Sequence, residues 1–121
     1  MSEDNRIQAE DHYYAGIDHF AEGRYQQAIQ EYRRALAIDP NLADAMHGLT
    51  RVLQDLERYD EAIEVATMLT QSNPDDILAH TSLSVLFQKK GMIAEAEAEA
   101  NKARIMGWKK QLQQQKAEQK Q

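Results

Sequence analysis

The sequence predicts an all-α protein, a solenoid built from pairs of helices. Three observations support this prediction: a pattern that returns every 34 residues, apolar positions at helical spacing within each period, and few turn-forming residues. The chain has 121 residues but only two prolines and five glycines, so its elements are long and their connections short. This length is sufficient for one core, and we expect a single domain over residues 1–121.

The repeat is clearest where each unit closes. The stretch EGRYQQAIQEYRRALAIDP ends at Pro40, and LERYDEAIEVATMLTQSNP ends 34 residues later at Pro74; the third equivalent position holds Trp108. A helix rarely continues through the residue before a proline, so both prolines mark the end of a unit. Small residues, which let two helices approach closely, recur in register at Ala28, Ala62 and Ala96. The turn at the middle of each unit falls at Gly23, Glu57 and Gly91.

We therefore expect three units of two helices each, at about 9–42, 43–76 and 77–107. A repeat buries its face only against a neighbour, so the third unit needs a cover. Gly107 is expected to end the preceding helix. Residues 108–118 then read as a capping helix, with Trp108 and Leu112 on one face over the third unit and a basic tail reaching residue 121. The total is about seven helices.

The combination of helix, turn, helix and closing proline resembles the tetratricopeptide repeat (TPR) family over roughly residues 7–106. The positions that match are Gly16, Ala28, Tyr32, Ala35 and Pro40 in the first unit, Met46, Leu49, Leu53, Ala62, Leu69 and Pro74 in the second, and Leu83, Ser84, Phe87, Ala96 and Ala103 in the third. His12, His19 and Thr50 depart from the family pattern. The resemblance implies a right-handed α-α superhelix and a non-catalytic protein–protein interaction module, an adaptor or assembly scaffold.

In that family the first helix of each unit lines a concave groove that binds a peptide or a partner helix. By family position the groove residues here are Glu10, Tyr13, Ile17, Phe20, Asp44, His47, Arg51, Asp55, Leu78, Thr81, Ser82, Val85 and Lys89. Apolar anchors among charges of both signs are typical of a selective surface, and Tyr13 is expected to anchor a partner. TPR proteins that hold the acidic C-termini of chaperones use a clamp of Lys, Asn and Arg. The five matching positions are Tyr13, Ile17, Gly48, Leu78 and Ser82, so clamp binding is not expected.

Composition restricts the other possibilities. A net charge of −6 argues against nucleic-acid binding, and no apolar run is long enough to span a membrane. The first residues are acidic where a signal peptide is basic, which makes a cytoplasmic protein the expectation. Residues 107–121 hold four lysines against one glutamate, and this basic end is either a solvated tail or a docking tail for acidic partners.

Catalytic and metal-binding patterns are missing from the sequence. No cysteine is present, and the four histidines include no pair at i and i+4, so they read as packing residues. Glu95 and Glu99 are expected to face water. We expect no enzyme activity, cofactor or metal. The alternative to the adaptor is a self-associating scaffold, for example a homodimer, with Trp108 or the first helix as the contact. A metal-binding protein or enzyme is a distant third.

Overall fold

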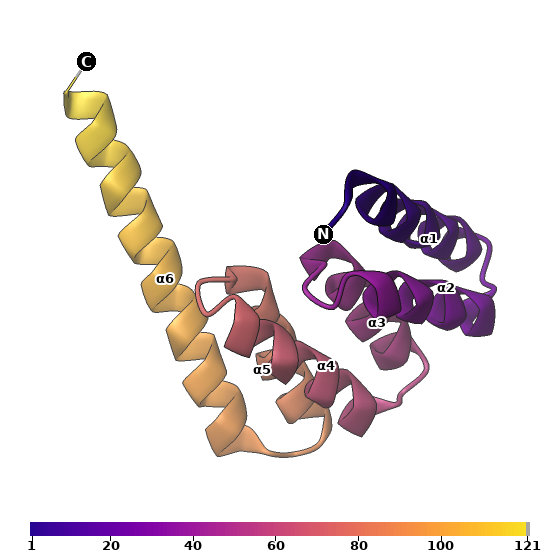
Figure 1. The fold of residues 1–121 in the computed structure, drawn as a ribbon. Helices are drawn as coiled ribbons and strands as arrows, with labels where there is room; N and C mark the ends of the chain where they lie inside the picture. The colour runs from indigo at the N-terminus through magenta and orange to yellow at the C-terminus, as the bar shows by residue number, and fades with distance from the viewer. Residues whose placement is uncertain (121) are drawn as a thin grey trace.

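The computed structural model describes residues 1–120 and is helical throughout that range, with short turns between the helices (Figure 1). The six helices are α1 (Glu3–Ala21), α2 (Tyr25–Ile38), α3 (Ala43–Asp55), α4 (Tyr59–Ser72), α5 (Ile77–Lys89) and α6 (Ile93–Gln119). Gln121, the last residue of the predicted basic tail, lies outside the described residues. The all-α class predicted from the sequence is confirmed.

The helices pack as three successive pairs. Each helix contacts the next along the chain, and the odd-numbered helices α1, α3 and α5 also contact one another in order. The odd helices therefore form one layer of the solenoid, and the even helices pack beside them in the other.

The turn inside each unit is the same structure three times. Gly23, Glu57 and Gly91 all have positive φ, at 78°, 60° and 74°. The following amide reaches back five residues in each case, for example from Arg24 N to His19 O at 2.9 Å. Together with the shorter bond from Gly23 N to Phe20 O at 3.0 Å, this is a Schellman motif, which satisfies the last carbonyl groups of a helix. The predicted turn positions are confirmed.

The core lies between the two layers. Ala28, Ala62 and Ala96 are each at most 1% exposed, which is where close helix contact requires a small side chain. The largest fully buried side chains belong to the second and third units. They are Val52, Leu53 and Leu69 in the second unit and Leu86 in the third.

The predicted break at Gly107 is wrong. α6 runs without interruption over 27 residues, and Gly107 lies inside it rather than in a left-handed cap. The separate capping helix at 108–118 therefore does not exist, and the helices number six within residues 1–120. Trp108 is 67% exposed and Leu112 is 52% exposed, so they do not cover the third unit.

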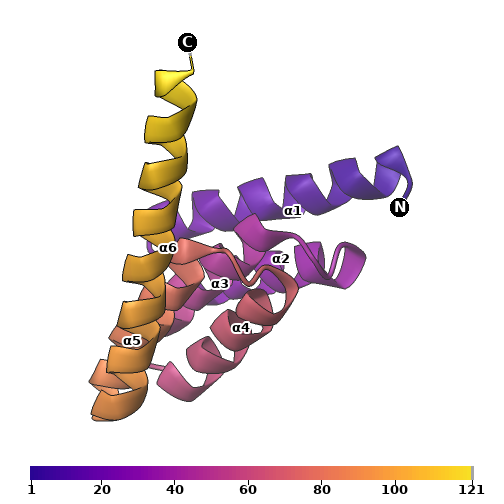
Figure 2. The ribbon, with the colours of Figure 1, turned by 90° about the vertical axis from the view of Figure 1, so that its left-hand side faces the viewer.

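The physical reason is that nothing stops the helix. Trp108 replaces the proline that closes the other units, and residues 109–119 are mostly Gln, Lys, Ala and Glu, which favour helix. Once a helix is nucleated, each further residue adds one hydrogen bond at little cost. The second half of α6 consequently projects away from the paired helices (Figures 1 and 2).

Candidate partner-binding groove

A groove of about 270 Å³ lies between α3 and α5. It forms because these two odd-numbered helices contact each other and turn equivalent faces to the same side. Its lining comprises His47, Thr50, Arg51, Gln54, Asp55, Leu78, Thr81, Ser82 and Val85. Seven of the residues assigned to the groove by family position are thus brought together here.

Arg51 connects this groove to α1. Its Nε donates a hydrogen bond to Asp55 Oδ1 at 3.2 Å, one helical turn further on. Its guanidinium carbon also lies 5.9 Å from the centroid of the Phe20 ring, a cation–π contact between α3 and α1. The side chain nevertheless stays 66% exposed, so a partner carboxylate has access to it.

His47 connects the groove to the start of α5. Its Nε2 lies 2.7 Å from Asp76 Oδ2. The other oxygen of Asp76 accepts a hydrogen bond from Ala79 N at 3.0 Å and so caps the N-terminus of α5. His47 therefore has a structural role between two units, and its contact with Asp76 is one that the family positions did not indicate.

The aromatic residues that α1 was expected to contribute to the groove pack against the core instead. Tyr13 and Phe20 are half-buried and pack against the core, and the Tyr13 ring centroid lies 6.1 Å from that of Tyr32. Burial, and then the negative charge of Asp44, raise the pKa of the Tyr13 phenol, so its hydroxyl stays protonated at neutral pH. Tyr13 is thus a packing residue as well as a candidate anchor.

The remaining predicted residues lie outside the groove lining. Ile17 of α1 is 38% exposed. Glu10 forms an ion pair on the same helix, with its Oε1 lying 3.7 Å from Nη1 of Arg6. Asp44 and Lys89 are exposed in the first turn of α3 and the last turn of α5 respectively.

Two histidines are held by glutamates of the neighbouring helix. His12 Nδ1 lies 2.7 Å from Glu31 Oε2, and His80 Nδ1 lies 2.6 Å from Glu99 Oε2. The expectation that Glu99 faces water is therefore wrong, because the partly buried carboxylate pairs with the buried His80. Both pairs span 19 residues and occupy the same position in the first and third units, a signal that the sequence contains. Within residues 1–120 no group of three or more acidic or histidine side chains is arranged to hold a metal ion.

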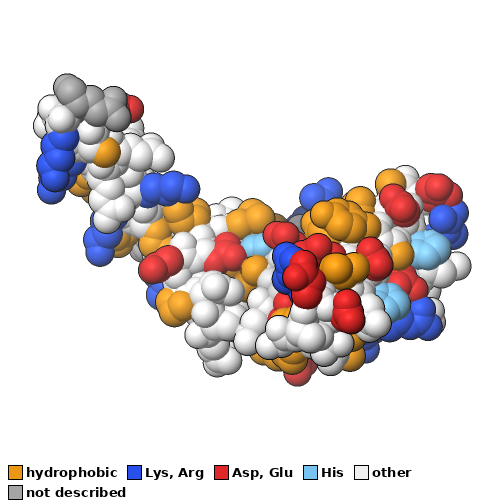
Figure 3. Space-filling model, turned by 45° about the horizontal axis from the view of Figure 1, so that its top comes forward, with side chains coloured by type: hydrophobic (Ala, Val, Ile, Leu, Met, Phe, Trp, Pro, Cys, Tyr) orange, Lys and Arg blue, Asp and Glu red, His pale blue; other side chains and the backbone are white. Residues whose placement is uncertain are grey.

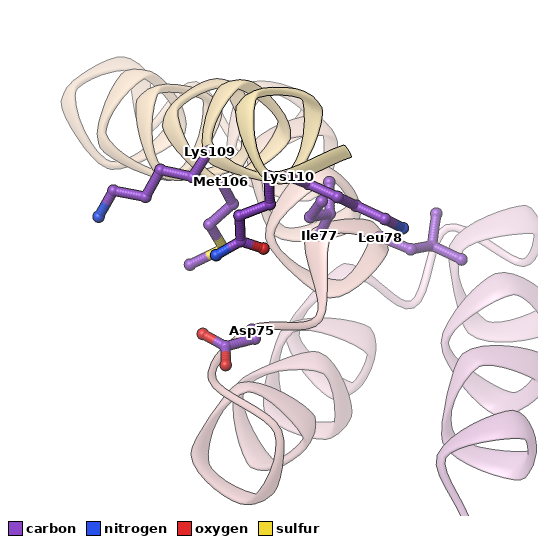
Figure 4. Close-up of a pocket in the computed structure, with 7 residues that line it drawn as sticks. Asp75, Ile77, Leu78, Met106, Lys109 and Lys110 are labelled. Atoms are coloured by element: carbon purple, nitrogen blue, oxygen red, sulfur yellow. The ribbon is translucent and has the colours of Figure 1, made fainter. Parts of the chain in front are cut away.

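A second cleft, of about 640 Å³, separates the start of α5 from α6 (Figure 4). Its lining is Asp75, Ile77, Leu78, Met106, Lys109, Lys110 and Gln113. The cleft exists because α6 continues straight past the position where the sequence predicted a turn.

Comparison with known proteins defines the family. The sequence pattern described as "Tetratricopeptide repeat" matches residues 19–86, more than half of the chain. The chain belongs to the tetratricopeptide repeat family. This TPR assignment agrees with the paired helices and with the in-register alanines, and it supports a protein–protein interaction scaffold as the class of function.

Solved structures show the same fold. MamA is 30% identical with a TM-score of 0.83 over 87% of this chain. The second TPR of Spaghetti (RPAP3), bound to the HSP90 peptide SRMEEVD, is 22% identical with a TM-score of 0.80, covering 85% of this chain and 95% of that one. The type III secretion translocator chaperone SycD of Yersinia enterocolitica is 20% identical with a TM-score of 0.77, covering 81% and 73%. The right-handed TPR superhelix predicted from the sequence is confirmed.

The extent of these similarities is limited. This chain spans 61% of the length of the MamA structure. A search of curated proteins finds no match. No helix within residues 1–120 combines the length and apolar character needed to cross a membrane.

Proposed function

We propose that this TPR protein is a non-catalytic adaptor or scaffold that binds a peptide or partner helix in the groove between α3 and α5. The observation that carries the proposal is the convergence of Leu78, Val85 and Arg51 on one hollow, although they come from two repeats. Leu78 is 57% exposed, a large apolar side chain that a partner would bury. Burying such a side chain is worth roughly 1.5–3 kcal/mol.

The lining indicates the chemistry of the partner. Arg51 offers a planar cation, so a carboxylate of the partner is the expected polar contact. The carboxylate of Asp55 lines the same groove beside Arg51, so it disfavours a run of acidic residues in the partner, because like charges repel. The five clamp positions carry no lysine, asparagine or arginine, so we propose a mixed apolar and acidic peptide rather than a chaperone tail.

A peptide-display selection against the immobilised chain tests this function. Peptides recovered on the wild type should bind Leu78→Glu and Arg51→Glu at least tenfold more weakly, as measured by fluorescence anisotropy. Both side chains are mainly exposed, so circular dichroism should be unchanged. Met68→Glu, on the even-numbered layer at 51% exposure, is the matched control and should bind as the wild type does. Selected peptides that bind all three variants equally would place the partner surface elsewhere.

A second candidate function is favoured by a separate observation. Helix α1 is acidic and the second half of α6 is basic. Within residues 1–120, Asp11 and Asp18 of α1 and Lys109 and Lys116 of α6 form no ion pair. This supports a self-associating scaffold, which is compatible with a groove that binds another protein.

A further inference from the structure

The outer face of α1 carries a stripe of acidic and apolar side chains. These residues, here named the head stripe, are Asp4, Ile7, Asp11, Tyr14 and Asp18, and all five are exposed. Steps of three and four residues keep them on one side of the helix. Ile7 is 45% exposed and Tyr14 is 58% exposed. Across residues 1–120, no ion pair involves any of the three aspartates.

The second half of α6 carries a stripe of the opposite kind. These residues, the tail stripe, are the apolar Ile105, Trp108 and Leu112 with the basic Arg104, Lys109 and Lys116 beside them, and all six are exposed. In the described part of the chain, Lys109 and Lys116 form no ion pair. Figure 3 shows Lys and Arg side chains alternating with hydrophobic ones on the projecting helix.

The two stripes match in spacing. Ile7 and Tyr14 are seven residues apart, as are Ile105 and Leu112. Seven residues of helix rise about 10.5 Å, so the apolar anchors of one stripe fit between those of the other in a short two-helix seam. The flanking aspartates then lie beside the flanking lysines.

Charge selects this pairing over the alternatives. α1 holds five carboxylates and one arginine, whereas residues 101–119 hold five basic residues and one glutamate. Two head stripes would bring acid against acid, and two tail stripes base against base, each of which is repulsive. Only head against tail joins opposite charges.

The stripes of one chain do not meet each other. Helices α1 and α6 make no contact in the described structure, and Figure 1 shows them at opposite ends of the row of helices. We propose that the head stripe of one copy docks on the tail stripe of a second copy. This deepens the self-association candidate named above and uses no residue of the groove. Because each copy keeps one stripe free, the contact is heterologous and builds open chains or a closed ring.

Sedimentation velocity of the 121-residue chain over a range of concentrations tests the proposal. The mass of the wild type should rise with concentration beyond that of a dimer. Association should weaken at least tenfold on moving from low salt to about 1 M salt, where the Debye length falls to about 3 Å. Trp108→Ala should weaken it at least tenfold as well, since an anchoring tryptophan is a frequent hot spot.

Charge reversal gives the decisive comparison. The variant D11K/D18K has two basic stripes, and K109E/K116E has two acidic stripes, so each alone should remain monomeric. An equimolar mixture should associate again, because each reversed stripe finds its complement on the other variant. The control Glu64→Lys with Glu95→Lys changes the net charge as much as D11K/D18K does, at exposed positions outside both stripes, and should associate as the wild type does.

Three results would overturn the proposal: a wild type that stays monomeric at low salt, single reversed variants that associate normally, or a mixture no heavier than its components. A monomeric wild type that instead sediments with anionic lipid vesicles would assign the tail stripe to a membrane surface. Binding of groove-selected peptides to the reversed variants is measured in parallel. Peptide binding that survives while assembly fails separates this proposal from the groove function.

Discussion

The middle unit and its two neighbours share one backbone fold but carry different side chains at equivalent positions. In the first and third units a histidine and a glutamate join the two helices, as His12 with Glu31 and His80 with Glu99. The equivalent positions of the middle unit hold Met46 and Val65, which pack in the core. The middle unit has a neighbour on both sides. Apolar side chains there avoid the cost of removing an imidazole and a carboxylate from water, which often equals or exceeds what their contact returns.

A second difference concerns volume. Tyr32 of the first unit is 3% exposed, and its ring lies against Gly16 of α1 and Gly48 of α3. The equivalent positions one repeat later are Ala66, with Thr50 and Ser82. Large and small side chains have thus exchanged places between units. Equal total volume at an interface preserves the packing even when individual residues change.

The largest effect is expected from filling the space beside Tyr32. An added Cβ at Gly48 would lie 2.6 Å from Tyr32 Cζ, and the ring has no room to move because Gly16 approaches it equally closely. We expect Gly48→Ala to destabilise the fold by about 1–3 kcal/mol in urea unfolding. Gly107→Ala is the control, since its added Cβ meets nothing within 4 Å, and it should stabilise helix α6 by about 0.5–1 kcal/mol.

Exchanging all three side chains tests the volume compensation more strictly. Replacing Gly16 by Thr, Tyr32 by Ala and Gly48 by Ser gives the contact between the first and second units the side chains found between the second and third. This triple variant should be more stable than Gly16→Thr with Gly48→Ser on the Tyr32 background. Equal unfolding free energies for the two would show that the exchange between units is not a volume compensation.

An effect of similar size is expected from removing one partner of the His80–Glu99 pair. His80 bonds to Glu99 through Nδ1 and to Pro74 O through Nε2 at 2.9 Å, and its side chain is 7% exposed. Glu99→Val leaves a buried nitrogen without a partner, which costs about 1–3 kcal/mol. His80→Met with Glu99→Val reproduces the middle unit and should recover most of that loss. A double variant less stable than Glu99→Val would mean that the apolar pair does not suit an outer unit.

The contrast between units also shows what the sequence can predict. The 34-residue period fixed the turns and the buried alanines, because those positions depend on backbone geometry that repeats. Side chains that join neighbouring units do not follow the period. Asp76 caps α5 and holds His47, yet its equivalent one repeat earlier is Leu42. Such contacts depend on how two units meet in space.

The failure at Gly107 has another origin. A glycine after a helical pattern predicts a helix end, although the same residue is tolerated inside a helix at modest cost. The decisive feature was the missing proline at Trp108 and the helix-forming residues after it. The paired histidines, in contrast, were predictable, because the 19-residue spacing from histidine to glutamate occurs twice in register.

A modest gain is expected at the turn of the middle unit. Glu57 has a φ of 60°, the left-handed conformation that glycine provides at Gly23 and Gly91. A residue with a Cβ costs roughly 1–2 kcal/mol in this region, so Glu57→Gly should raise the unfolding free energy by about 1 kcal/mol. Gly23→Ala makes the reverse change and should lower it by a similar amount. A Glu57→Gly variant with an unchanged thermal midpoint would mean that the turn tolerates the glutamate without strain.

The smallest effect expected is a change in acid sensitivity at the first unit. The hydrogen bond from His12 lowers the pKa of Glu31 most, burial opposes it, and Arg34 lowers it further. A carboxyl whose pKa is lower in the folded state stabilises the fold above its unfolded pKa, near 4.3, and loses that contribution as the pH falls through the folded value. Urea unfolding from about pH 6 to pH 3 should therefore show stability falling less steeply in His12→Met with Glu31→Val than in the wild type. Glu64→Gln, at an exposed glutamate of α4, is the control and should retain the wild-type slope. Identical slopes in the double variant and the wild type would mean that the contact with His12 does not lower the pKa of Glu31 in the folded protein.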